Sequence, residues 1–284
     1  LKSLFDRGVS PTALNTYINC PLDFYYKYVI GVREADDVEE TIDHTSFGTY
    51  LHEVLERLYQ PYADKNINLT IEDVKQMQKK VPDVALQVFS RQMSERELKS
   101  GKNLLTFSVA QKYIITFLTN EITFIKNQQD DLYIKLLEQS LEGSLTIGSQ
   151  QIKLKGTADR VDMFGNTLRI IDYKTGMVKS TELKVKNLEE LKSGKKSKAF
   201  QILMYAYLYA QQNKLNEMNL HSGVVSFRTL SSGFMPFVLE KEKEISSTML
   251  VDFEEVLKEI FTEITDATTP FIHKASAQYC EFCD

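Results

Sequence analysis

The chain has 284 residues, with 34 basic and 39 acidic side chains and a formal net charge of −5 at pH 7. Apolar residues make up 43% and charged residues 26%, with 6 prolines and 12 glycines; this excludes wholesale disorder and collagen-like or mucin-like architecture. No run approaches the ~18 consecutive apolar residues of a membrane span. The acidic balance excludes a uniformly basic coat for nucleic acid and leaves a local basic groove open.

Three cysteines in this length exclude a disulfide scaffold and suit a reducing compartment, so we expect a cytoplasmic protein. Cys20 lies near the start, whereas Cys280 and Cys283 form a C-x-x-C close to the end. The chain begins with Leu1 and carries no signal-peptide pattern. We expect it to be a piece of a longer polypeptide.

The first helical signals lie near the amino terminus. Ser10-Pro11 is typical of a capping residue followed by proline at the first helical position, and it predicts a helix through about Tyr17. Pro21 predicts a second, tyrosine-rich helical turn. Apolar residues that recur at helical spacing predict another helix over 47–59.

Further along, the sequence favours two or three helices between residues 70 and 127, and we expect 60–130 to form a helical insertion or subdomain. The pattern then mixes strands with helices, which predicts a mixed α/β core over 131–240. Strands are expected at 132–146, 151–163, 167–174, 221–228 and 234–240, helices at 200–213 and 243–265, and a lysine-rich connector from Met177 to about Lys198.

The stretch KGTADRVDMFGNTLRIIDYKTG, residues 155–176, predicts a β-hairpin. Gly165-Asn166 suits a two-residue type II′ turn, because glycine at the first position accepts a positive φ. The register that follows pairs Asp162 with Arg169 on one face and apolar residues on the other. Such a pairing is self-consistent.

The same register sets Asp159 directly opposite Asp172. Opposed Cβ atoms lie ~4.5–5.5 Å apart and like charges there destabilise a sheet, so this pair needs a cation or a bound proton. Lys174 projects from the same face two residues further on. The three groups can hold a hard divalent ion through oxygen ligands, with Lys174 beside a bound water. They can equally form a salt-bridged patch in which Lys174 neutralises one aspartate.

Asp159, followed by Asp172-Tyr173-Lys174 near the end of the next strand, resembles the signature of the PD-(D/E)XK nucleases, specifically the RecB-like group. Other segments resemble that group's motifs in the same order: SPTALNTYINCPLDFYYKYV at 10–29, GTYLHEVLE at 48–56, QILMYAYLY at 201–209 and CEFC at 280–283. Residues 60–130 have no counterpart in this match.

The resemblance implies a single nuclease domain over 1–284, with a restriction-endonuclease-like mixed sheet flanked by helices. It implies that a metal ion, Mg²⁺ or Mn²⁺, is held by His52, Asp159, Asp172 and the backbone carbonyl of Tyr173. It assigns catalysis to Asp159, Asp172, Lys174, Gln201 and Tyr205.

Without the resemblance, two of these assignments have simpler readings. His52 could pair with Glu56 on a solvated helix face, and Tyr205 could be core packing. Glu138 could reach the same face as the aspartates, although its position favours a solvated strand residue.

The lysine-rich connector is typical of a solvated loop, yet its position would let it follow a phosphate backbone. The candidate nucleic-acid-binding residues in it are Lys192, Lys195, Lys196 and Lys198.

The resemblance also implies a 4Fe-4S cluster in the parent protein, with Cys20, Cys280 and Cys283 as three ligands and a fourth cysteine beyond Asp284. Because iron–sulfur clusters are usually held by four cysteines, the cluster could be absent from this chain. Two ordinary thiols, or zinc held by an incomplete set, are the alternatives. The role of a cluster would be to staple residues 10–30 to residues 270–284.

We therefore expect a metal-dependent DNA nuclease, in particular an exonuclease, with no membrane partner. No Walker A motif occurs, so the expected partners are DNA, as single-strand or double-strand ends, and a helicase domain or subunit of a machine that repairs double-strand breaks. A stand-alone exonuclease of the CRISPR-adaptation type and a catalytically silent DNA-end clamp are the alternatives.

Overall fold

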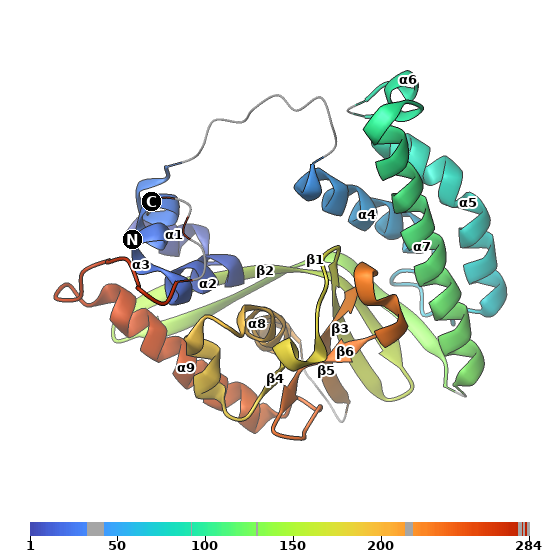
Figure 1. Ribbon diagram of the computed structural model, residues 1–284. Coiled ribbons are helices and arrows are strands. Elements are labelled where there is room, and N and C mark those ends of the chain that lie inside the picture. The colour runs from blue at the N-terminus through green and yellow to red at the C-terminus, as the bar shows by residue number, and fades with distance from the viewer. Residues whose placement is uncertain are drawn as a thin grey trace.

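The computed structural model describes residues 1–32, 43–91, 93–128, 130–213 and 218–277, together with Cys280 and Phe282. A central sheet carries helices on both sides (Figure 1). Within these ranges, no helix is both long and apolar enough to cross a membrane.

The centre of the fold is a five-stranded mixed sheet in the order β1-β2-β3-β5-β6. Antiparallel pairing joins β1 to β2, β2 to β3 and β5 to β6, whereas β3 and β5 run parallel. The strands are β1 (Leu132–Ile147), β2 (Gln150–Phe164), β3 (Thr167–Lys174), β5 (Asn219–Ser226) and β6 (Met235–Pro236). This mixed sheet, flanked by helices, confirms the expected α/β fold class.

The β2–β3 hairpin has the register that the sequence predicts. Paired residues run from Phe164–Thr167 to Arg160–Ile171 and include Asp162 opposite Arg169. Gly165 adopts a φ of +54° in the turn, which a side chain would disfavour. The paired ladder ends one position before the two aspartates would face each other.

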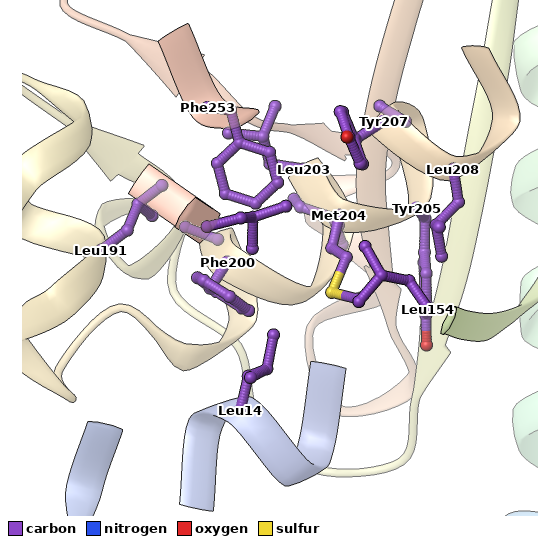
Figure 2. Close-up of a cluster of buried hydrophobic side chains, with 14 of the residues drawn as sticks. Leu14, Leu154, Leu191, Phe200, Leu203, Met204, Tyr205, Tyr207, Leu208 and Phe253 are labelled. Atoms are coloured by element: carbon purple, nitrogen blue, oxygen red, sulfur yellow. The ribbon is translucent and has the colours of Figure 1, made fainter. Parts of the chain in front are cut away.

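One face of the sheet packs against α1 (Lys2–Arg7), α2 (Pro11–Asn19), α8 (Ser197–Gln212) and α9 (Ser247–Thr265). Helix α8 is apolar and buried around nearly its whole circumference, as expected of a helix enclosed on all sides. In Figure 2, Phe200 and Leu203 of α8 lie among side chains from neighbouring elements, including Leu14 of α2 and Phe253 of α9.

The other face packs against α4 (His44–Tyr59), α5 (Ile71–Phe89) and α7 (Gly101–Asn127). Ile170 belongs to the first hydrophobic cluster and Ile171 to the second, because neighbouring strand residues point to opposite faces. Burial on both faces explains why β3 is almost continuously buried.

Local signals set the helix boundaries. Ser10 caps α2 by accepting a hydrogen bond from the backbone N–H of Ala13 at 3.2 Å. Asp43 caps α4 in the same way through Ser46, at 2.7 Å, so this helix starts three residues before the predicted position. Between α2 and α4, α3 (Pro21–Phe24) continues into a π-helical turn, Tyr25–Ile30.

The predicted helices between 70 and 127 are present as α5, α6 (Glu95–Leu98) and α7. Thr70 and Asp73 form a reciprocal capping box at the start of α5. Buried residues Val74, Met77 and Val81 follow at helical spacing.

Several other expected boundaries also differ, and α8 begins at Ser197 rather than at residue 200. Residues 227–232 form a 3₁₀ helix in place of the end of a strand. The expected strand at 234–240 is divided: β6 joins the central sheet, and β7 (Val238–Leu239) pairs in parallel with β4 (Lys184–Val185) in a second sheet. Helix α9 begins at Ser247, four residues late, because Ser246 supplies the cap.

The lysine-rich connector is also more ordered than expected. It contains 3₁₀ helices at Ser180–Leu183 and Leu188–Ser193 with β4 between them. Leu183, Val185 and Leu191 are buried in the first hydrophobic cluster. Burial of these leucine and valine side chains anchors the connector against the core.

Candidate active site

The site forms where β2 and β3 diverge and α4 approaches them. Asp159 of β2 places Oδ1 3.3 Å from Nδ1 of His52, and its Oδ2 accepts a 2.5 Å hydrogen bond from the backbone N–H of Tyr173. Nε2 of His52 lies 3.1 Å from the carbonyl oxygen of Tyr173. One imidazole therefore contacts both strands of the hairpin.

Asp172 lies on the other side of Tyr173 and is 3% exposed. Its Oδ1 accepts hydrogen bonds from Nζ of Lys174 at 3.1 Å and from Nε2 of Gln201 at 3.3 Å. Gln201 Nε2 also lies 2.6 Å from the hydroxyl of Tyr205, one turn further along α8. Helix α8 thereby holds the amide that contacts the carboxylate.

The second oxygen of Asp172 has an unusual environment. Nζ of Lys174 lies 2.9 Å from Oδ2, yet the alignment does not make a hydrogen bond, and among the described residues this buried atom has no hydrogen-bond partner. Buried carboxylate oxygens almost always have one. Oδ2 is thus ion-paired with Lys174 and is a candidate oxygen ligand for a cation.

Glu138 is the residue whose expected role the structure changes. Leu137–Arg160 and Gln139–Ala158 are paired on either side of it, so Glu138 occupies the position opposite Asp159. Its carboxylate lies 3.9 Å from Nδ1 of His52 and its side chain is 31% exposed. The glutamate faces the site, rather than being an ordinary solvated strand residue.

The backbone of Glu138 is strained as well. Its φ is +44°, a left-handed conformation that a residue with a side chain adopts at a cost of about 1–3 kcal/mol. Such strain persists where the surrounding structure enforces it. A β-bulge lies nearby in β1, between Ile134 and Leu136, and changes the direction of the strand. A single sequence carries no signal for this bulge.

The acidic groups and His52 shift one another's pKa values. Burial raises the pKa of Asp172 to about 6, against the opposing effect of Lys174 and with the help of Asp159. Burial and the charge of Asp159 raise the pKa of Glu138 to about 7. Burial alone would lower the pKa of His52, but its hydrogen bond to Asp159 and the surrounding carboxylates raise it overall. Burial and the crowding of negative charge thus favour the protonated forms of the two carboxyl groups.

The donor set fits a hard divalent cation. His52, Glu138 and Asp159 each offer a ligand atom, and these atoms lie within 4.8 Å of one another. The carbonyl oxygen of Tyr173, 3.1 Å from Nε2 of His52, adds a further oxygen, whereas Asp172 is not part of this group of mutually close ligand atoms. Carboxylate and carbonyl oxygens with one imidazole suit Mg²⁺ or Mn²⁺.

The candidate nucleic-acid-binding lysines lie in the ordered connector and at the start of α8. Three of the four have partners within the chain: Lys192 with Glu189 and Glu259, Lys196 with the carbonyl oxygens of Thr181 and Lys184, and Lys198 with Glu182. Phosphate would have to compete with these partners. Their role in binding stays a prediction.

The cysteines are separate from this site in the fold. Cys20, between α2 and α3, and Cys280 are both buried. Cys283 lies outside the described residues.

The comparison with family models covers almost the whole of this architecture. The model of the PD-(D/E)XK nuclease superfamily matches residues 8–284, and the chain belongs to that superfamily. Nucleases of this superfamily use divalent metals, in agreement with the candidate metal site at His52, Glu138 and Asp159.

Relatives give a second comparison. The chain is 31% identical over 176 residues to an uncharacterized protein of Rickettsia conorii, covering 61% of this chain and 20% of that protein. It is 23% identical to a subunit of the ATP-dependent helicase/deoxyribonuclease of Clostridioides difficile, over 86% of this chain and 21% of that one. The corresponding subunit of Carboxydothermus hydrogenoformans is 24% identical, over 90% of this chain and 22% of that one. The chain thus spans about a fifth of the length of these relatives.

Proposed function

We propose that this chain is the nuclease part of a helicase–nuclease and that it hydrolyses DNA phosphodiester bonds with Mg²⁺ or Mn²⁺. The observation that carries the proposal is the convergence of His52, Asp159 and Asp172 on Tyr173, with Lys174 beside them. The second oxygen of Asp172 is ion-paired with Lys174 without an aligned hydrogen bond, which leaves it available as a ligand for a cation.

In this proposal, His52, Asp159, Asp172 and the carbonyl of Tyr173 would hold the cation, with Glu138 as a further ligand. When bound, the cation supplies positive charge beside the scissile phosphate and acidifies a water molecule. The backbone N–H of Tyr173 keeps one oxygen of Asp159 fixed, so that the other is directed at the site. Two carboxylates at fixed positions define where the cation and the phosphate meet.

Lys174 has the position of a group that acts on the reacting water. Its side chain is 29% exposed, whereas Asp172 beneath it is buried, so the ammonium lies between the acidic cluster and solvent. There Nζ would orient the attacking water and offset the negative charge that develops on the phosphate oxygens. Asp172 holds Nζ in place through its 3.1 Å hydrogen bond.

Gln201 and Tyr205 would act on this arrangement from α8. The amide of Gln201 contacts Asp172 and the hydroxyl of Tyr205, and burial, followed by the charge of Asp172, raises the pKa of Tyr205. The tyrosine therefore stays protonated, and its hydroxyl orients the amide. Both residues would position the metal-binding carboxylate.

The biological context rests on the relatives. Proteins named as a subunit of an ATP-dependent helicase/deoxyribonuclease match most of this chain with about a fifth of their own length. We propose that this chain likewise works beside a helicase domain or subunit, as an exonuclease that acts on DNA ends during double-strand-break repair.

Cleavage of an end-labelled linear duplex, and of its single strand, tests the proposal. Reactions contain Mg²⁺, Mn²⁺ or EDTA, and a covalently closed circle separates exonuclease from endonuclease action. Metal-dependent cleavage of the linear DNA alone is expected, with the product ladder revealing polarity. The Lys174→Ala protein should bind DNA and not cut it.

The matched control is Lys153→Ala, because Lys153 is an exposed lysine on β2 that lies roughly 20 Å along the strand from Asp159. This control should cut like the parent. Cleavage by the Lys174→Ala protein at the parental rate would refute the site. Binding of DNA ends without cleavage in any metal would favour the silent clamp over the nuclease.

A further inference from the structure

The side chain of Tyr173 points to the opposite face of β3 from Asp172 and Lys174, although its backbone forms part of the candidate site. It is buried in the second hydrophobic cluster, between the sheet and the helices α4 and α7 (Figure 1). Its ring lies 5.5 Å from that of Phe117 in α7 and 5.8 Å from the imidazole of His52 in α4. The packing around this ring therefore influences where the Tyr173 backbone lies.

Arg160 of β2 lies beside this ring. It pairs with Ile171 of β3, so its side chain points to the same face as those of Ile171 and Tyr173. Diagonal neighbours across a strand pair are within reach of long and aromatic side chains. Arg160, Glu121 and Tyr173 accordingly line one cavity between the sheet and α7. The arginine side chain is 1% exposed, so its charge has to be compensated inside the fold.

Three elements hold the guanidinium of Arg160. Its Nη2 lies 2.7 Å from Oε1 of Glu121 in α7 and 2.6 Å from Oδ2 of Asp162 in β2. Its Cζ lies 4.7 Å from the ring centroid of Tyr59 in α4, which is a cation–π contact. One buried cation thus joins α4 and α7 to the strand that carries Asp159.

We propose that Arg160 is a positioning residue for the metal site, an inference that rests on the proposed nuclease function. Arg160 directly follows Asp159 in β2, so the contacts that fix its side chain also fix the strand at Asp159. Through Tyr59 it holds α4, where His52 lies about two turns earlier on the same side of the helix. Asp159 and His52 both contact the backbone of Tyr173.

Stability alone is a weak reason for such a cluster. Replacing a buried ion pair by apolar side chains of similar volume is often neutral or stabilising. A guanidinium with two carboxylate partners has a different property, because its planar fork is satisfied in few arrangements of the surrounding elements. Glu121, Asp162 and Tyr59 come from α7, β2 and α4. Their shared partner therefore fixes the relative positions of these elements.

The same contacts would give the predicted helical insertion, residues 60–130, a role at the candidate site. Its helix α7 supplies Glu121, which is bonded to Arg160. A displacement of α7 would change the position of Arg160 and, through it, the position of Asp159. Metal affinity should therefore respond to a change in α7 that removes no metal ligand.

Titration calorimetry with Mn²⁺ and cleavage kinetics on linear duplex DNA test the assignment. Glu121→Gln keeps a hydrogen-bond acceptor and removes the charge, whereas Arg160→Lys keeps the charge and removes the planar fork. Each variant should weaken Mn²⁺ binding by about 10–100-fold and lower kcat at saturating Mn²⁺, with an unchanged KM for DNA. Glu121→Gln carries the test alone if Arg160→Lys does not fold.

Arg169→Lys is the matched control, because Arg169 is a buried arginine bonded to Asp162 nearer the hairpin turn. It should lower Tm about as much as Arg160→Lys does, while Mn²⁺ affinity and kcat stay parental. Parental Mn²⁺ affinity in Glu121→Gln, or an equal loss of affinity in Arg169→Lys, would overturn the inference.

The affinity measurement also separates this inference from the proposed function. A parent protein that binds Mn²⁺ without cutting DNA would refute the nuclease, whereas weaker Mn²⁺ binding in Glu121→Gln than in Arg169→Lys would still support the positioning role. A parent protein that binds no Mn²⁺ would overturn both.

Discussion

The carboxylate of Asp159 accepts a 2.5 Å hydrogen bond from the backbone N–H of Tyr173, the residue between Asp172 and Lys174. The paired ladder of the hairpin ends at Arg160–Ile171, so a side chain takes over the hydrogen bonding where the two backbones separate. The carbonyl of the same Tyr173 faces His52. Because the strands separate here, the backbone N–H and C=O of Tyr173 both face the site. In a continuous sheet these two groups would hydrogen-bond to the neighbouring strand.

Glu138 should contribute to metal binding. Glu138→Gln is expected to weaken Mn²⁺ binding by about 10–100-fold and to slow cleavage at low metal concentration, because it removes a charged oxygen beside His52 and Asp159. Isothermal titration with Mn²⁺ measures the affinity. Glu142→Gln, four residues along β1 at an exposed position, is the control and should match the parent. Equal affinities in both variants would exclude Glu138 from the site.

Metal binding should weaken as the pH falls. The pKa values of Glu138 and Asp172 are raised to about 7 and about 6, and that of His52 is raised as well. A group whose pKa is raised in the folded state stabilises the metal-free protein at low pH. That contribution is lost as the pH rises through the group's folded-state pKa. A bound cation replaces these protons, so its stabilising effect should grow over the same range.

Thermal unfolding with Mg²⁺ or EDTA at about pH 8 and about pH 5.5 measures this linkage. The increase in Tm caused by Mg²⁺ should be clear at the higher pH and small at the lower one. Asp172→Asn should reduce the difference. An equal Mg²⁺ effect at both pH values would contradict the linkage.

Tyr205 should affect catalysis through Gln201. Tyr205→Phe removes the hydroxyl that lies 2.6 Å from the amide of Gln201, which in turn contacts Asp172. We expect kcat to fall by about tenfold, with unfolding almost unchanged, because the ring still fills its place in the core. Tyr209→Phe, one turn further along the same buried helix, is the matched control. A loss of activity in both variants would point to a packing effect instead.

Asp162 should be structural although it lies three residues from Asp159. Its side chain is fully buried, and Arg169 donates hydrogen bonds to both of its carboxylate oxygens, at 2.7 and 2.9 Å. Arg160 contacts the same carboxylate. Asp162→Ala should destabilise the fold by about 3–5 kcal/mol, since it leaves buried guanidinium groups without a counter-charge. Denaturant unfolding measures this. Asp159→Ala should instead abolish cleavage with a much smaller loss of stability, and the opposite ranking would refute the division of roles.

The hairpin was predictable from the sequence because its information is local. A Gly-Asn turn and alternating side chains specify which residues oppose one another, and the register follows. Asp162 and Arg169 are paired as expected. The buried helix α8 was equally clear, since its apolar residues surround the whole helix. Boundaries set by Asp43 and Ser246 were missed by three or four residues, because capping residues outweigh the apolar periodicity there.

The tertiary structure decided which residues that are far apart in the sequence come together. His52 reaches the carbonyl of Tyr173 across 121 residues only because α4 packs on the second hydrophobic cluster beside β3. Glu138 turns toward them because its own backbone adopts a left-handed conformation in β1, and His273 meets Cys20 across 253 residues. Hydrophobic periodicity and turn chemistry act between near neighbours, so they determine strands, helices and the hairpin register. The meeting of distant side chains depends on how whole elements pack against the sheet, and that information is spread over the entire core.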